Sequence, residues 1–185
     1  MSTKTTNRLE GQIAGFTLDG YPAPTSALFV LITRLVMGGF LLFAGIGKFM
    51  EWPFDASGYL VHGVDAASPV SGIYAAMAAN ELMLATINVI IPLTQVLIGI
   101  ALILGVLVRL AALGGALQMM AFYLGGWEGG WLGLMDGTLV YAAVFLLLGA
   151  LAAGRIAGLD RHIEQWNVGG QPLVERFPAS RYLLG

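Results

Sequence analysis

No charged residue stands between Glu81 and Arg109. This run is longer than the about 20 mostly apolar residues that a helix needs to cross the hydrocarbon core of a bilayer. Residues 110–127 and 137–154 are uncharged as well, and residues 27–47 contain only Arg34. The chain is 57% hydrophobic and 11% charged, whereas soluble domains carry about 25% charged residues. The sequence therefore predicts a helical protein that crosses the membrane several times.

We expect an all-α membrane protein with a bundle of four transmembrane helices, at about residues 27–48, 86–108, 110–126 and 136–154. Near the centre of the first span, Arg34 costs about 2.5 kcal/mol, which the surrounding apolar residues outweigh at roughly 5 kcal/mol. Around the membrane domain, residues 27–154, we expect a polar N-terminal segment (1–26), an outer loop (49–85), and a cytoplasmic interfacial helix and tail (155–185).

The basic residues predict the orientation. Apart from Arg34 and Lys48, they lie before the first span, between the second and third, or after the fourth: Lys4, Arg8, Arg109, Arg155, Arg161, Arg176 and Arg181. By the positive-inside rule, both termini are cytoplasmic and the protein lies in the cytoplasmic membrane. Short interfacial helices are expected within residues 69–85 on the outer face and around residues 159–166 on the inner face.

Arg34 is a candidate site residue because an ionisable side chain inside a span is costly and commonly functional. Its depth matches that of Gln118, so we expect these two side chains to pair. Arg34, Gly38, Gly45 and Lys48 share one helix face, on which the glycines let another backbone or a flat ligand come close. Two interpretations stay open: Arg34 links helices, or it takes part in binding a ligand or transferring a proton.

A second group of candidates lies at the outer membrane boundary. Lys48, Asp136 and Glu81 are expected at one depth, with Trp127 and Trp131 at the same interface. A quinone ring would suit this set, because Lys48 can donate to a quinone oxygen and a carboxylate can relay a proton. The alternative is an ordinary ion pair at the rim, flanked by interfacial tryptophans.

Gln95 lies near the middle of the second span, one turn after Pro92. The proline should kink the helix and free a carbonyl, and the amide could bind a quinone head group. Polar side chains in spans more commonly join helices to one another.

Several classes of function are disfavoured. The chain has no cysteine, so thiolate metal sites and iron–sulfur clusters are excluded, and we expect no metal. His62 and His162 both lie outside the predicted spans, so a haem site is not expected. The net charge of −2 and the scattered basic residues argue against binding of nucleic acid.

Three stretches resemble the DoxX/DoxD family. Residues 34–48 (RLVMGGFLLFAGIGK) are similar to its first span, residues 91–109 (IPLTQVLIGIALILGVLVR) to its second span and basic exit turn, and residues 154–160 (GRIAGLD) to the end of its fourth span. Gln95 departs from the pattern, since an acidic residue often stands there, and this weakens a proton-relay role at that position.

The resemblance implies a four-helix membrane subunit of an oxidoreductase complex. DoxD proteins are the small subunit of thiosulfate:quinone oxidoreductase, which acts with a second protein subunit and passes electrons to quinone. We therefore expect a quinone-facing subunit in contact with membrane lipid. The alternatives are a non-catalytic anchor or assembly subunit of a respiratory or redox complex, and a small-molecule permease, for which Arg34, Gln95 and Gln118 offer few polar groups.

Overall fold

A computed structural model describes residues 9–13, 16–20 and 24–184 of the chain. Three of its helices are long and apolar enough to cross a membrane, and a shorter apolar helix is a fourth candidate. These helices are α1 (Pro24–Met50), α3 (Glu81–Leu104), α4 (Val108–Gly125) and α5 (Gly137–Ala150). Their outward side chains are large and apolar, Phe43 and Leu82 among them. The protein is thus an all-α membrane protein that contacts lipid.

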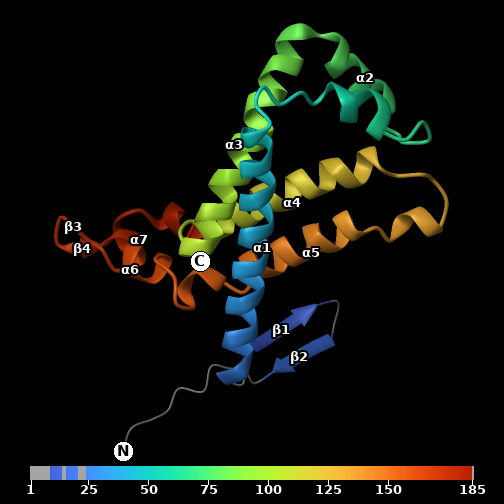
Figure 1. Ribbon diagram of the computed structural model, residues 1–185. Coiled ribbons are helices and arrows are strands. Elements are labelled where there is room, and N and C mark those ends of the chain that lie inside the picture. Colours follow the sequence, from blue (N-terminus) through green and yellow to red (C-terminus); the bar gives the residue numbers. More distant parts are fainter. Residues whose placement is uncertain (1–8, 14–15, 21–23, 185) are drawn as a thin grey trace, which may run out of the picture.

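The four helices form two pairs that diverge (Figure 1). Helix α1 packs mainly on α3, and α4 mainly on α5, whereas contact between α1 and α5 is slight. The buried core lies where the pairs meet, and its largest members are Leu41, Leu102, Phe145 and Leu148. The two helix pairs therefore pack against each other at one end of the molecule and lie apart at the other end.

Glycines on α1 and α3 allow the backbones of this pair to approach closely. A Cβ atom on Gly99 would lie 2.6 Å from the backbone nitrogen of Leu42, and one on Gly45 would lie 2.8 Å from the carbonyl oxygen of Pro92. The glycine face of α1, with Gly38 and Gly45, is therefore occupied by the α3 backbone, which is one of the two occupants expected from the sequence.

The connection between α1 and α3 covers the C-terminal end of α4, on the side that the basic residues predict to be the outer one; the terms outer and inner refer to these predicted sides. It contains the π-helix η1 (Tyr59–Gly63) and helix α2 (Ser71–Ala79). The Ser68 and Tyr74 hydroxyls donate to the carbonyls of Leu124 and Ala121 at 2.6 and 2.8 Å. Helix α2 ends at Asn80, whose side chain accepts from the amide of Met83 and caps α3. This connection thus links the two helix pairs at the outer end.

The observed helix ends differ from the expected ones. Helix α3 begins at Glu81, before the predicted start of the second span at residue 86. Helix α5 covers Gly137–Ala150 of the predicted span 136–154, because Ala152 adopts a positive φ of 50° that ends the helix. At about 1.5 Å per residue, α5 is shorter than a full bilayer crossing.

The remaining elements are short. The expected polar segment 1–26 lies partly outside the described residues, and its described part contains the antiparallel hairpin β1 (Leu9–Ile13) and β2 (Phe16–Gly20), which was not predicted. The C-terminal region contains η3 (Ala153–Arg155), α6 (Asp160–Glu164), β3 (Asn167–Val168), β4 (Gln171–Pro172), α7 (Leu173–Arg176) and η4 (Pro178–Tyr182), and η2 (Leu132–Leu134) precedes α5.

Candidate functional site

Arg34 binds the chain just after the fourth helix, and the predicted pairing with Gln118 is wrong. Its side chain is 1% exposed. The guanidinium donates through Nη1 to the carbonyls of Ala153 and Ile156, at 2.5 and 2.8 Å, and through Nη2 to the carbonyl of Ala157 at 3.4 Å. The pairing was predicted by matching the depths of the two residues alone. The carbonyls that follow the end of α5 have no partners within an α-helix, and they are strong acceptors for a planar cation.

Asp160 joins the same region to α4, and the sequence analysis gave it no role. We use the name inner junction for the contacts of Arg34 with residues 153–157 and of Asp160 with residues 107–108. Its carboxylate is fully buried and accepts from the amides of Leu107 and Val108 at 2.7 and 3.0 Å. The N-terminus of α4 leaves such amides without partners inside the helix, and its dipole favours a negative charge. Asp160 therefore fixes the C-terminal segment to the start of α4.

Two glycines allow the Arg34 side chain to reach this junction. Gly105 has φ of 67°, and a Cβ there would lie 3.0 Å from Arg34 Nη1. A Cβ on Gly158 would lie 3.0 Å from the same nitrogen. Arg34, the turn from α3 to α4 and the stretch 154–160 thus meet at one point, so three motifs that are separate in the sequence form one structural unit.

Gln95 lies on α3, and Gln118 lies on α4 in contact with Thr94, the neighbour of Gln95. Gln95 is 2% exposed, and Gln118 of α4 donates through Nε2 to Oγ1 of Thr94 at 3.4 Å. The side-chain oxygens of both glutamines are buried without a hydrogen-bond donor among the described residues. A buried acceptor without a donor costs about 1–3 kcal/mol. The interior therefore offers two amide oxygens that could accept hydrogen bonds from a bound molecule.

The outer candidates do not form one cluster. Lys48 donates to the carbonyl of Ala44 at 3.3 Å and lies over the ring of Phe54 at 5.7 Å. Within the described part of the chain, no ion pair joins it to Asp136 or Glu81. Asp136 instead caps α5 by accepting from the Thr138 hydroxyl and amide at 2.6 and 3.2 Å, and these hydrogen bonds lower its pKa. Glu81 is exposed at the start of α3.

The two tryptophans have different surroundings. Trp131 is 89% exposed, as expected of an interfacial side chain. The indole nitrogen of Trp127 is buried without an acceptor among the described residues, and Gly133 lies against this ring. Trp127 is half-buried, and its indole nitrogen is covered by the loop around Gly133.

Tyr59 and Tyr74 were missed by the sequence analysis as parts of the protein interior. The Tyr59 ring contacts Phe122 and Tyr74 edge-on, and its hydroxyl donates weakly to the carbonyl of Phe122 at 3.4 Å. Burial raises the pKa of both phenols. The aromatic residues of the outer loop are visible in the sequence, but their contacts with α4 depend on how the loop folds back.

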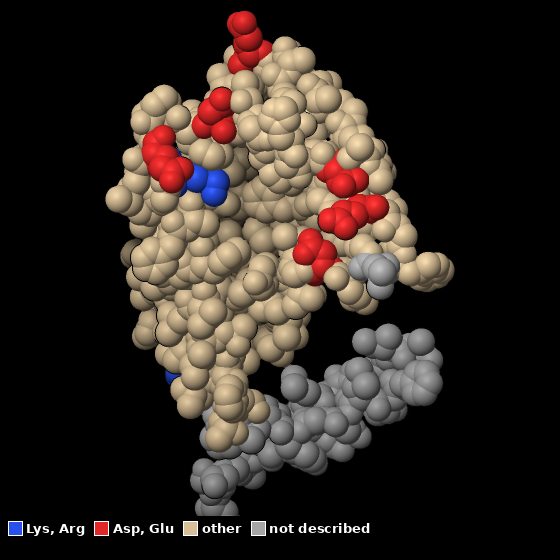
Figure 2. Space-filling view, turned by 45° about the vertical axis from the view of Figure 1, so that its right-hand side comes forward, with Lys and Arg blue, Asp and Glu red and all other residues tan. Residues whose placement is uncertain are grey.

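Figure 2 shows a hollow on one face of the molecule, with acidic groups on both sides and a basic group at its rim. Because the two helix pairs diverge, the helix bundle is open between them. Among the described residues, no cluster of histidine, aspartate and glutamate could hold a metal ion. The polar groups available for hydrogen bonding are thus the buried amides of Gln95 and Gln118, the indole nitrogen of Trp127, and Lys48 at the rim.

These features define a multi-pass helical membrane protein with buried amide groups and a charged outer rim. The DoxX family matches over residues 29–126, more than half of the chain, and the chain belongs to this family. The match covers α1, α3 and α4. No curated protein and no solved structure matches the chain significantly.

Proposed function

We propose that this DoxX protein is the quinone-facing membrane subunit of an oxidoreductase complex that includes a second protein subunit. The two buried amide oxygens of Gln95 and Gln118 are the observation that carries the proposal. They lie within an apolar membrane domain, where quinones dissolve, and the resemblance to thiosulfate:quinone oxidoreductase suggests the same class of carrier.

The residues fit the reduced form of the carrier best. A quinone supplies two-electron, two-proton redox chemistry in the membrane. Its reduced form carries two hydroxyl donors, which match the two acceptors that lack donors. In this proposal, Gln95 and Gln118 accept these hydrogen bonds, and Thr94 orients Gln118 through the 3.4 Å contact with its amide nitrogen. The indole nitrogen of Trp127 is a buried donor for a carbonyl or ether oxygen.

Lys48, Asp136 and Glu81 are proposed to act at the rim as separate groups. Lys48 forms no ion pair with either carboxylate, so its ammonium group is available to donate to an oxygen at the membrane boundary. Replacing Lys48 with Met should then lower quinone reduction by the assembled complex at least roughly tenfold, equivalent to about 1.4 kcal/mol. Unchanged turnover of the variant, with the complex intact, would show that Lys48 takes no part in quinone reduction.

A non-catalytic anchor or assembly subunit is the second candidate. The observation that favours it is that Arg34, which is almost fully buried, directs both terminal nitrogens of its guanidinium to carbonyls of the same chain. In an anchor, the buried amides would serve only to position helices, and the redox centres would belong to the partner subunit.

The decisive experiment measures quinone that co-purifies with the protein from the membrane in a mild detergent. Gln95→Leu and Gln118→Leu should each reduce the bound quinone severalfold, because each removes an acceptor, while Gln165→Leu on the exposed C-terminal region should not. Thermal unfolding of each variant provides the folding control. Equal quinone content in all four proteins, with folding intact, would reject the quinone site and leave the anchor. Mass spectrometry of the same preparation tests for the second subunit.

A further inference from the structure

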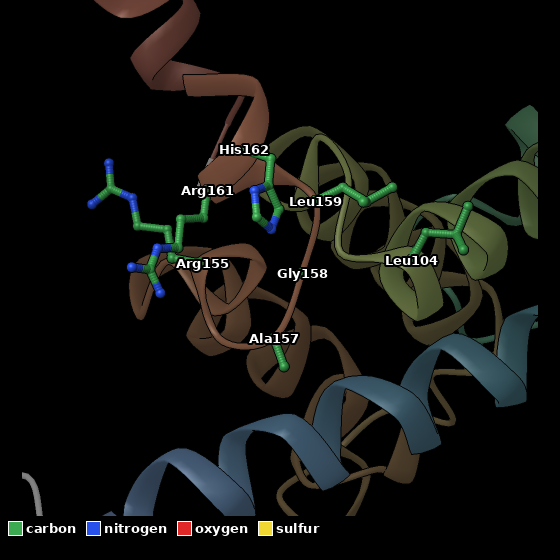
Figure 3. A pocket seen from close by; sticks show the side chains of 7 residues that line it. All are labelled: Leu104, Arg155, Ala157, Gly158, Leu159, Arg161 and His162. Atoms are coloured by element: carbon green, nitrogen blue, oxygen red, sulfur yellow. The ribbon is translucent and has the colours of Figure 1, made fainter. Parts of the chain in front are cut away.

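A cavity of about 320 Å³ lies beside the inner junction, between the end of α3 and the start of α6 (Figure 3). It is lined on one side by Arg155, Arg161 and His162 and on the other by Leu104 and Leu159, with Gly158 between them. The basic and apolar side chains lie on opposite sides of the view, and the two arginine side chains extend away from the leucines. The cavity thus combines a cationic wall with an apolar one.

The cationic wall retains hydrogen-bonding capacity. Glu164 binds Nε and Nη2 of Arg155, at distances of 2.8–3.1 Å, which leaves Nη1 of this guanidinium unused by Glu164. Arg161 and His162 are exposed, and their side chains form no hydrogen bond or ion pair within the described part of the chain. After Glu164 neutralises one charge, the two arginines still leave a net positive wall.

The apolar wall places the cavity at the edge of the membrane domain. Leu104 is the last residue of α3, and it and Leu159 are each about half exposed. The exposed Trp166 follows on the same C-terminal region, and tryptophan favours the headgroup level of a bilayer. A ligand that fits both walls has an anionic group for the arginines and an apolar or glycerol-like part for the leucines.

We propose that this cavity binds the phosphate of a phosphate ester. Arginine guanidinium groups match phosphate oxygens with paired N–H donors, and basic pockets at the inner ends of transmembrane helices bind anionic lipid headgroups. The same chemistry would accept a phosphodiester of a membrane lipid or a soluble phosphate monoester. This site is independent of the proposed quinone site, which involves Gln95 of α3 and Gln118 of α4.

The test uses the full chain, purified in detergent, and native mass spectrometry. One arm adds phosphatidylglycerol, with phosphatidylcholine as the zwitterionic control, and the other adds soluble glycerol 3-phosphate. We expect binding of the anionic ligand, and Arg161→Gln should weaken it at least about fivefold, as removal of one cation near an anionic headgroup predicts. Arg161→Lys, which keeps the positive charge, should weaken this binding less than Arg161→Gln does.

Arg176→Gln is the matched control, because Arg176 is an exposed arginine of the same C-terminal region that does not line the cavity. It should change binding less than about twofold, well short of the roughly fivefold effect of one cation in the cavity. Phosphatidylglycerol binding that depends on Arg161 identifies a lipid site, and glycerol 3-phosphate binding with the same dependence identifies a soluble ester. Binding of neither, or equal losses in Arg161→Gln and Arg176→Gln, would overturn the proposal.

Discussion

Replacing Arg34 with Leu removes the guanidinium that joins α1 to the chain after α5. Two of its three acceptors are at least partly shielded from water, since Ala153 is fully buried and Ile156 is half-buried. Each buried carbonyl that loses its donor costs about 1–3 kcal/mol. For the two shielded carbonyls together, this amounts to about 2–6 kcal/mol. We therefore expect a loss of about 2–6 kcal/mol, although Leu would be favoured in an isolated membrane helix.

Thermal unfolding in detergent, followed by tryptophan fluorescence and size-exclusion chromatography, measures this effect. In a chain of this size, 1 kcal/mol corresponds to about 2–4 °C, so the midpoint should fall by at least about 4 °C. Arg34→Lys should also destabilise, because one ammonium group cannot reproduce the planar fork that reaches separate carbonyls.

Arg161→Leu is the control, since it removes an exposed arginine whose side chain forms no hydrogen bond or ion pair within the described part of the chain. Its midpoint should stay close to that of the wild type. A midpoint for Arg34→Leu equal to that of Arg161→Leu would refute the argument that the three carbonyls depend on the guanidinium.

Three further outcomes are expected. A cysteine at Ser57 should react with an impermeant thiol reagent in intact cells and one at Ser180 should not; the reverse labelling would contradict the predicted orientation. Gly99→Ala should destabilise the protein by about 1–3 kcal/mol because its Cβ would collide with the α1 backbone, whereas Gly39→Ala, with open space around the Cβ, should not; similar unfolding midpoints would argue against this close approach. The raised pKa of Tyr59 means that its contribution to stability is present below about pH 10 and is lost at higher pH, so Tyr59→Phe should unfold at a higher pH than the wild type, and an unchanged alkaline transition would count against burial of this phenol.

The transmembrane helices could be predicted because hydropathy depends on local sequence. The uncharged run before Arg109 contains most of α3, and the run after it contains most of α4. The early start of α3 at Glu81 was missed because residues 81–85 were assigned to the interfacial helix expected within residues 69–85. Its start is set by Asn80, whose side-chain oxygen caps the helix. The sequence alone does not distinguish a capping asparagine from one that has another role in a loop.

The partners of the buried polar residues could not be predicted in the same way. Arg34 has a depth that can be counted from the sequence, but its acceptors exist only because α5 ends at Ala150 and the chain turns back. Asp160 looked like a surface residue of an amphipathic helix, and its burial depends on contact with the distant start of α4. Gln95 and Gln118 were recognised as polar residues in spans, whereas their lack of donors is a property of the assembled interior.

The two ends of the molecule are held together by different interactions, and this difference predicts where it opens. At the inner end, Arg34 and Asp160 form charge-assisted hydrogen bonds, which are roughly twice as strong as neutral ones. At the outer end, Ser68 and Tyr74 form neutral hydrogen bonds with α4, each worth about 1 kcal/mol. Separation of the helix pairs should therefore begin at the outer end. In hydrogen exchange of the protein in lipid nanodiscs, the amides of residues 64–79 should exchange faster than those of residues 105–110. Slower exchange in residues 64–79 would show that the inner junction is the weaker one and that the ranking by charge is wrong.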